Sequence, residues 1–328
     1  MERLIEIDDR DSGLRAVIAI DSTVLGPAAG GVRAQAYASF ADAVADARAL
    51  AHAMTMKCAL AGLDAGGGKA VVWDHGAWDR EKGFARLGQA IEELGGAFRT
   101  AGDLGTTAAD LAVMARQCSY VHTGEAELAN AVASGLLACA GACLERRGRG
   151  WSGLRVAIQG AGSIGAACAR AFAAHRADLV VADLDPERAK RLAREVQATT
   201  VPADRLLDVS CDLLVPCAGG GVLTVAAVDA MRAWAVVPAA NNAVADRAAG
   251  RRLVARGILH VPDIVASAGA VIDGIGRTVM GLDRAERSRL IGRLGPLAGE
   301  ILEASAATGT PADEVAEARA AGKLQKLM

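Results

Sequence analysis

One short segment constrains the fold more than any other part of the chain. The apolar run Leu154–Ile158 leads into the turn Gly160–Gly165, of sequence GAGSIG, and a helical pattern covers 163–175. The first glycine of such a turn bends the chain, the second lets the backbone approach a pyrophosphate, and the third lets the helix pack closely on the strand. Free N–H groups at the helix start attract the phosphates. The segment therefore predicts a dinucleotide-binding turn.

The same pattern of strand and helix continues after the turn. It predicts a strand at 179–182, a helix at 186–196, and short strands at 213–215, 235–237 and 258–261. Strands that alternate with helices indicate a doubly wound, mostly parallel sheet. Asp183 ends the second strand, where a carboxylate accepts hydrogen bonds from an adenosine ribose and repels a 2′-phosphate. This favours NAD over NADP, although Arg188 lies close by. A glycine turn without a ligand is the alternative.

The remainder of the chain also mixes strands and helices. A length of 328 residues suggests about two domains. In the N-terminal third we expect a strand at 14–20, strands at 55–61 and 69–73 that flank a glycine turn at 66–68, and helices at 39–54, 80–95 and 106–117. Further helices are expected at 127–147, 284–308 and 311–321.

Composition excludes several classes of protein. Lys and Arg total 36 against 38 for Asp and Glu, which gives a net charge of −2 and no basic arm for nucleic acid. Aromatic residues make up only 3%, too few for stacking on bases. The 7 cysteines contain no C-x-x-C pair, so we expect neither a disulfide framework nor a zinc site. We expect a soluble cytoplasmic protein with no metal, nucleic acid or membrane partner.

Two lysines of the N-terminal third lie in an unusual setting. Lys57 falls at the expected helix-to-strand junction, and Lys69 directly follows three glycines. Most lysines are solvated surface charges. These two lie beside apolar strands, where burial and a second nearby lysine both lower a lysine pKa. A neutral lysine can act as a base or polarise a carbonyl group. The glycines at 66–68 would let a small substrate approach the backbone.

Several motifs in colinear order together resemble the Glu/Leu/Phe/Val dehydrogenases, from about Leu14 to about Gly281. They are Gly30-Gly31-Val32-Arg33, Met54-Thr55-Met56-Lys57, Gly66-Gly67-Gly68-Lys69, Thr100-Ala101-Gly102-Asp103, the turn at 160–165, and Ala239-Ala240-Asn241-Asn242. The resemblance implies reversible oxidative deamination of an L-amino acid to its 2-oxo acid and ammonia, with reduction of NAD. It also implies a homo-oligomer, at least a dimer.

The resemblance further implies a two-domain α/β fold with a cleft between the domains. Residues 1–127 would form the catalytic and oligomerisation domain, completed by C-terminal helices at about 282–328, and 128–281 would form a Rossmann domain. Lys57 would pair with the substrate carboxylate, Lys69 would activate water and polarise the oxo group, and Asp103 would shuttle a proton. The cofactor-binding positions would be Gly160, Gly162, Ser163, Ile164, Asp183, Cys217, Ala218 and Asn241. Substrate would contact Gly30, Gly31, Ala29, Ala101, Asn242, Val271 and Gly274.

The substrate side-chain pocket implied by the resemblance is lined by small residues. Leucine-type members carry larger aliphatic residues where this chain has Ala29 and Gly274. The freed space favours an aromatic amino acid, phenylalanine or tryptophan. Alternatives are a leucine or valine substrate, with backbone shifts filling the space, and a catalytically impaired NAD-binding protein with a sensing role. Three departures from the family surround the nicotinamide position and bear on cofactor affinity: the short loop 123–127, Val132 and Ser267.

Overall fold

The computed structural model describes residues 3–123 and 128–327, which fall into two compact units. The first unit contains Met1–Ala126, Ile275–Gly281 and Ala320–Met328, and the second contains Glu127–Gly274 and Leu282–Arg319. Each unit is built around its own sheet. Both mix helices with strands, which confirms the α/β class expected from the sequence.

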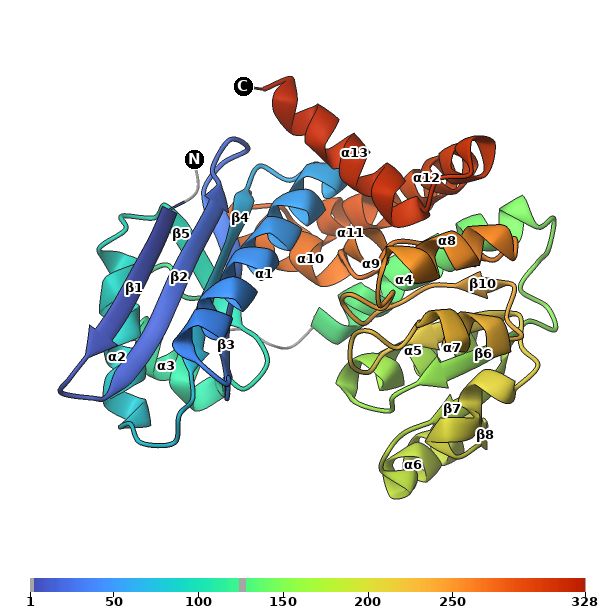
Figure 1. Ribbon diagram of the computed structural model, residues 1–328, viewed down its shortest axis with the longest axis horizontal. Helices are drawn as coiled ribbons and strands as arrows, with labels where there is room; N and C mark the ends of the chain where they lie inside the picture. The colour runs from blue at the N-terminus through green and yellow to red at the C-terminus, as the bar shows by residue number, and fades with distance from the viewer. Residues whose placement is uncertain (1–2, 124–127, 328) are drawn as a thin grey trace. The chain divides into compact units, whose positions relative to one another are not determined.

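The first unit has a five-stranded sheet in the order β1-β2-β4-β3-β5. Strands β1, β2 and β4 pair antiparallel, whereas β3 runs parallel to both β4 and β5. Helix α1 covers one face of the sheet, and α2 and α3 cover the other (Figure 1). The elements are β1 Arg3–Asp9, β2 Leu14–Ser22, β3 Ala28–Gln35, α1 Phe40–Ala61, β4 Gly66–Trp73, α2 Arg80–Glu92, β5 Phe98–Gly102 and α3 Ala108–Ala115.

Helix α1 is longer than the sequence pattern indicates. It begins after the N-cap Ser39 and ends at Gly62, which adopts a left-handed conformation with φ 69°. The stretch 55–61 is therefore helix, and its assignment as a strand was wrong. Every residue from Thr55 to Leu60 is buried, so the stretch has no polar face to reveal a helical period. Lys57 accordingly lies near the end of α1 and not at a helix-to-strand junction.

The three glycines before Lys69 lie inside β4, and the expected turn at 66–68 was wrong. A methyl group on Gly66 would lie 1.7 Å from the backbone oxygen of Ser22, and one on Gly67 would lie 2.2 Å from the backbone nitrogen of Thr55. A methyl group on Gly68 would lie 2.8 Å from the ring of Phe98. The protein's own backbone and side chains thus fill the space beside these three glycines, where a substrate was expected to approach the backbone.

The second unit has a six-stranded sheet in the order β11-β10-β9-β6-β7-β8, with every pair parallel. This is the doubly wound arrangement expected from the sequence. The strands are β6 Arg155–Gln159, β7 Asp178–Ala182, β8 Thr199–Thr200, β9 Leu213–Pro216, β10 Ala235–Val236 and β11 Leu259–His260. The helices that begin in this unit are α4 Leu128–Arg146, α5 Ser163–Ala174, α6 Pro186–Val196, the 3₁₀ helix Ala203–Asp208, α7 Val225–Ala230, α8 Arg247–Ala255, α9 Asp263–Ala266, α10 Gly269–Thr278, α11 Arg284–Gly292, α12 Leu294–Thr308 and α13 Ala312–Gln325.

The C-terminal helices divide differently from the expected domain bounds. Residues 282–319 belong to the second unit, and only 320–328 join the first. Helix α12 packs against α4, where the Cys139 thiol lies 3.7 Å from the backbone oxygen of Leu294. The expected helix at 284–308 breaks at Arg293, because Pro296 lacks an N–H and its ring clashes with the carbonyl four residues earlier.

Helix α4 is the one described helix whose length and composition would allow it to cross a membrane. It packs against α5 and α12, and half of its most apolar stretch is buried inside the protein. Burial of this kind is typical of a core helix.

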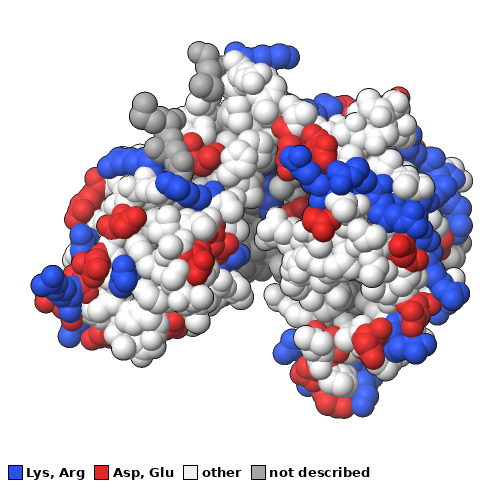
Figure 2. Space-filling view, viewed as in Figure 1, with Lys and Arg blue, Asp and Glu red and all other residues white. Residues whose placement is uncertain are grey.

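Surface charge is mixed in sign across the visible face of the first unit, whereas Lys and Arg gather over α8 in the second (Figure 2). Two of these arginines have acidic partners, since Arg252 lies 2.5 Å from Asp229 and Arg247 lies 4.0 Å from Glu314. The basic band is therefore partly neutralised by the protein itself.

Gly67 offers a test of the close packing between β4 and α1. We expect Gly67→Ala to destabilise the protein by about 1–3 kcal/mol or more, because both atoms nearest the added methyl group belong to the backbone of α1. Thermal and urea unfolding would measure the change. Gly322→Ala is the control, since it lies in a helix with nothing within 4 Å of the added carbon, and its stability should stay equal or rise. Equal stability of both variants would contradict the packing described here.

Candidate active site

Strand register brings the candidate residues of the first unit onto one face of its sheet. Ala29 pairs with Gly67, and Gly31 pairs with Ala101. Alternate residues of a strand share a face, so Lys69 lies on the same face as Ala29, Gly31 and Ala101. This is also the face that α1 covers, because Ala51 and Thr55 of α1 approach Gly67. Both candidate lysines therefore belong to this side of the sheet.

Lys69 and Asp103 form the centre of the site. Lys69 is only 6% exposed, and its amine donates a hydrogen bond to Oδ2 of Asp103. Burial lowers the pKa of Lys69 below its ordinary value, and the Asp103 carboxylate opposes that shift without cancelling it. Burial alone would raise the pKa of Asp103, but Lys69 and Arg33 together hold it below its ordinary value. The site thus pairs a carboxylate with an amine that deprotonates more readily than a surface lysine.

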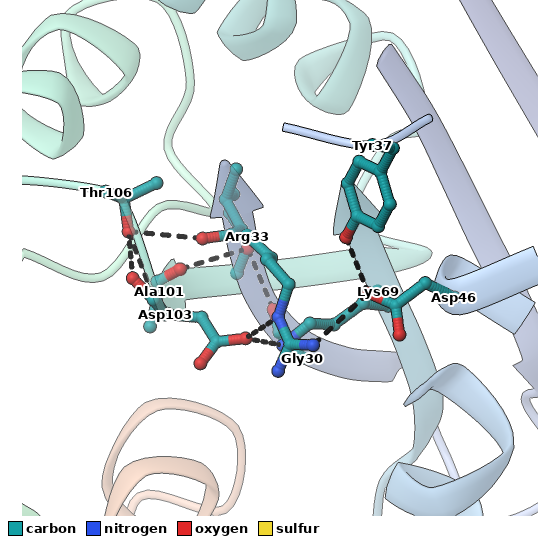
Figure 3. Close-up of polar contacts among 10 residues, drawn as sticks. Gly30, Arg33, Tyr37, Asp46, Lys69, Ala101, Asp103 and Thr106 are labelled. Atoms are coloured by element: carbon teal, nitrogen blue, oxygen red, sulfur yellow. Dashed lines mark hydrogen bonds and ion pairs between the residues drawn. The ribbon is translucent and has the colours of Figure 1, made fainter. Parts of the chain in front are cut away.

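Arg33 joins the same carboxylate from β3. Its Nε lies 3.3 Å from Asp103 Oδ2, and its Nη1 lies 3.2 Å from Oδ2 of Asp46 on α1. The hydroxyl of Tyr37 donates a 2.5 Å hydrogen bond to the same oxygen of Asp46. The Arg33 guanidinium therefore lies between two carboxylates, and the second oxygen of Asp103 points away from it (Figure 3).

The loop that carries Asp103 is fixed through its backbone. The hydroxyl of Thr106 accepts a 2.9 Å hydrogen bond from the Asp103 N–H and lies 3.1 Å from the Val32 carbonyl oxygen. The N–H of Ala34 donates to the Leu104 carbonyl at 2.9 Å. These bonds tie the loop to β3 on one side of the carboxylate. They set where the Asp103 main chain lies.

Two further glycines allow the strands to meet closely at this point. A methyl group on Gly30 would lie 1.7 Å from the backbone oxygen of Gly68. One on Gly31 would lie 2.9 Å from Cβ of Asp103, so the bare α-carbon of Gly31 lets Asp103 approach the sheet. Lys57 is 7% exposed on α1. Burial of two lysines in a single unit is unusual for a residue that is normally solvated.

The nucleotide turn of the second unit lies at the carboxyl end of the parallel sheet. Gly160 has φ 96°, a conformation that favours glycine, and a methyl group on Gly165 would lie 1.9 Å from the Gly160 oxygen. In the part of the chain that the structure describes, only chain neighbours lie within 4 Å of the position that a Gly162 side chain would take. Ser163 and Ile164 open α5, whose N-cap Gly162 makes no side-chain cap bond. The tight turn at Gly160, the close packing at Gly165 and the open space at Gly162 all fit a bound pyrophosphate.

Asp183 fastens this turn to the end of β7. Its Oδ2 accepts a 2.7 Å hydrogen bond from the N–H of Ala161, and its Oδ1 accepts one of 2.8 Å from Asp185. Arg188 lies 3.6 Å from Asp183 and 3.8 Å from Asp185. A carboxylate has about four acceptor positions, so Asp183 keeps capacity for ribose hydroxyls. The charge of Arg188 is shared between two carboxylates.

The remaining candidates of the second unit lie on neighbouring segments. Cys217 and Ala218 directly follow β9, where the Cys217 N–H donates to the Gln159 carbonyl at 2.7 Å. Asn242 has φ 51° and its N–H donates to Asp263 at 3.1 Å, and Asn241 precedes it. Val271 and Gly274 lie one helical turn apart on α10.

Two of the three departures from the family pattern, Val132 and Ser267, lie within the described residues. Val132 is buried on α4, and the Ser267 hydroxyl donates to the Asp263 carbonyl at 2.7 Å. A methyl group on Gly269 would lie 3.0 Å from the Val132 nitrogen, so α4 and α10 pack closely there. Residues 124–127 of the short loop lie outside the described residues.

Sequence reasoning missed Asp46, Thr106 and the role of Arg33. Arg33 stood in a quoted motif, but nothing in the sequence links it to Asp46 or to Asp103, which is 70 residues away. Thr106 had a local signal, because a threonine three residues after an aspartate often bonds back to the backbone.

Residues 2–120 match the model "Glu/Leu/Phe/Val dehydrogenase, dimerisation domain", and 179–275 match "Glutamate/Leucine/Phenylalanine/Valine dehydrogenase". Leucine dehydrogenase of Thermoactinomyces intermedius is 33% identical over 97% of this chain and 90% of its own. Valine dehydrogenase of Streptomyces coelicolor is 36% identical over 98% and 92%. The crystal structure of L-tryptophan dehydrogenase from Nostoc punctiforme aligns with TM-score 0.86 and 28% identity, covering 99% and 96%.

The coupling of Lys69 to Asp103 can be tested without knowing the reaction. The Asp103 charge raises the pKa of Lys69 against the effect of burial, so Asp103→Asn should lower that pKa further. We expect acetylation of Lys69 by acetic anhydride, followed by peptide mass spectrometry, to begin at lower pH in the variant. Acetylation of Lys82, which is 70% exposed, serves as the internal control. An unchanged pH dependence at Lys69 would contradict the pairing.

Proposed function

Because the chain belongs to the Glu/Leu/Phe/Val dehydrogenase family, we propose that it catalyses the NAD-dependent oxidative deamination of an aromatic L-amino acid, phenylalanine or tryptophan. The products are the 2-oxo acid and ammonia, and the reaction is reversible. The observation that carries the proposal is the buried Lys69–Asp103 pair on the glycine-lined face of the first sheet.

The charges of the first unit suit each part of the reaction. Lys57 binds the substrate carboxylate. Asp103, held ionised by its two cations, accepts a proton from the substrate ammonium group, since loss of hydride from Cα requires a neutral amine. Lys69 in its neutral form takes a proton from the water that adds to the resulting iminium carbon. Asp103 then returns its proton to the amino group, and as ammonia leaves, the hydroxyl proton passes to the Asp103 carboxylate and the 2-oxo acid forms. Bound NAD supplies the hydride acceptor.

The cofactor assignment rests on the second unit. Gly162 leaves open space at the start of α5, and Asp183 is ionised at neutral pH with its pKa held low by backbone N–H groups despite its burial. Its charge disfavours the 2′-phosphate of NADP. Asn241 and Asn242 border the nicotinamide and the substrate amino group in this proposal. Two carboxylates beside Arg188 reduce its attraction for a phosphate.

The aromatic substrate is supported by small side chains. Ala29 and Ala101 belong to the first unit, and Gly274 with Val271 belongs to the second. Among the described residues, no atom outside α10's own backbone and the two chain neighbours lies within 4 Å of the position of a Gly274 side chain. A relative of known structure is named a tryptophan dehydrogenase, whereas curated relatives of similar length are named leucine and valine dehydrogenases. Deamination of leucine or valine is therefore the second candidate.

We also propose that the protein is cytoplasmic and forms a homo-oligomer, at least a dimer. The matched model for the N-terminal region describes a dimerisation domain. A sensing role without catalysis is less consistent with the site, because Lys69 and Asp103 are both present and paired.

A panel of L-amino acids tests the substrate assignment. NADH formation at alkaline pH, with NAD and with NADP, should be faster for phenylalanine or tryptophan than for leucine or valine. Activity on leucine or valine alone would replace the aromatic assignment with the branched-chain one. Intact NAD binding with no activity on any amino acid would contradict the proposed reaction.

A variant of the pocket sharpens this test. Gly274→Val should lower kcat/KM for aromatic substrates relative to leucine by about tenfold or more. The valine side chain takes space from the larger substrate, and each methylene group of the substrate that can no longer be buried costs ~0.8 kcal/mol of binding free energy. Gly292→Val adds the same side chain at an open position of α11 and should leave the preference unchanged. An unchanged preference for aromatic substrates in Gly274→Val would contradict the assignment that rests on the size of the pocket.

Lys69 provides a test of the chemistry itself. Lys69→Ala should lower kcat by about 10³-fold or more, because it removes the base that activates water, while the affinity for NAD stays the same. Isothermal titration with NAD and steady-state kinetics measure the two effects, with Lys82→Ala as a surface control. Near-normal turnover in Lys69→Ala would show that the mechanism is wrong.

A further inference from the structure

A charged row extends behind the catalytic pair and has no role in the reaction as described so far. It begins at the Tyr37 hydroxyl and passes through Asp46 and Arg33 to Asp103 and Lys69 (Figure 3). The members come from β3, the segment after it, α1, β4 and the loop after β5. Positive and negative groups alternate along the row.

Arg33 occupies the central place in this row. Its side chain is 17% exposed, and two of its nitrogens face two different carboxylates at 3.3 and 3.2 Å. The planar guanidinium fixes the angle between these two contacts, which the single nitrogen of a lysine does not. Asp46 is held in turn by the hydroxyl of Tyr37. Arg33 therefore reaches Asp103 from an anchored position.

The backbone near Asp103 does not depend on Arg33. Thr106 and the bond between the Ala34 N–H and the Leu104 carbonyl fix the loop through main-chain atoms. What remains to be fixed is the side chain of Asp103. Arg33 and Lys69 both contact its Oδ2, so the two cations orient the carboxylate and turn the other oxygen away from them (Figure 3).

We propose that Arg33, anchored by Asp46, is a positioning residue that holds the Asp103 carboxylate against Lys69 with one oxygen left for the substrate amine. This inference rests on the proposed function, since it assigns the free oxygen to proton transfer. Arg33 itself contacts no reacting atom in this scheme. Its effect reaches the substrate through the orientation of Asp103 and through its charge.

The charge of Arg33 changes the pKa of Lys69 in a direction that can be measured. The charged groups that act on Lys69 come from three sides: Arg33 on β3, Asp46 on α1 and Asp103 after β5. Arg33 lowers the pKa of Lys69, whereas Asp46 raises it. Removal of Arg33 should therefore raise the pH at which Lys69 becomes neutral, and removal of Asp46 should lower it.

Three variants test the proposal through the pH profile of kcat/KM with the best substrate. Arg33→Gln should move the acidic limb to higher pH by about half a unit or more and lower kcat by about 10–100-fold. Asp46→Asn should move that limb in the opposite direction and also lower kcat. Arg33→Lys keeps the charge, so its limb should stay near that of the wild type while kcat falls. The affinity for NAD should be unchanged in all three.

A matched arginine controls for loss of a cation from the first unit. Arg15 lies over the rings of Phe40 and Trp73 at 4.4 and 5.2 Å, so Arg15→Gln should leave both the pH profile and kcat unchanged. If Arg33→Gln behaved like Arg15→Gln, the positioning role would be overturned. Shifts of the same sign in Arg33→Gln and Asp46→Asn would also overturn it.

Acetylation of Lys69 separates this inference from the proposed function. If the wild type deaminates no amino acid, the proposed function fails, and the pH dependence of Lys69 acetylation is then measured in the same variants. Opposite shifts in Arg33→Gln and Asp46→Asn would still support the electrostatic role of the row. Identical profiles would overturn it. Arg33→Lys and Asp46→Asn keep the test available if Arg33→Gln does not fold.

Discussion

The candidate site of the first unit depends on the charge balance around Lys69. A lysine ammonium group that is 6% exposed is strongly destabilised unless an anion lies beside it. Asp103 supplies that anion from the loop after β5, and the bare α-carbon of Gly31 lets it approach the sheet. A side chain at Gly31 would clash with Asp103, and one at Gly67 would clash with α1, so these two glycines leave room for the ion pair and for the helix that covers it.

The two units handle charge in different ways. The second unit offers phosphates the backbone N–H groups of a helix start, and the acidic side chain beside that turn, Asp183, is held by two main-chain bonds. The first unit concentrates full charges on one face of its sheet. Backbone dipoles suit a cofactor that binds in one fixed form. Titratable side chains suit a substrate that gains and loses protons during the reaction.

This difference also explains how much could be predicted from the sequence. The first half of the second unit followed local rules: the strand, glycine turn and helix at 155–174 and the helix at 186–196 agree with the structure almost to the residue, whereas β8 and the helices α7 to α10 were not predicted. In the first unit, β1, β3 and β5 were not predicted, and the end of α1 was assigned as a strand. Glycine-rich strands have the composition of turns, and a helix end that is buried all round shows no period. Tertiary contacts decided both.

The candidate site shows the same contrast between residues that stand in local motifs and residues that only tertiary contacts bring together. Lys57, Lys69 and Asp103 were predicted because they stand in short motifs, and the structure brings Lys69 and Asp103 together. Asp46 stands in no motif, and its contact with Arg33 depends on how α1 lies across β3. A row of alternating charges is a property of the fold and not of any one segment. Besides burial and Asp103, this row gives two opposing influences on the pKa of Lys69. Arg33 lowers that pKa, and the more distant Asp46 raises it. The proton affinity of the amine is consequently set from three separate elements, and substitution of Arg33 on β3 or of Asp46 on α1 would adjust it without replacing Lys69 or Asp103.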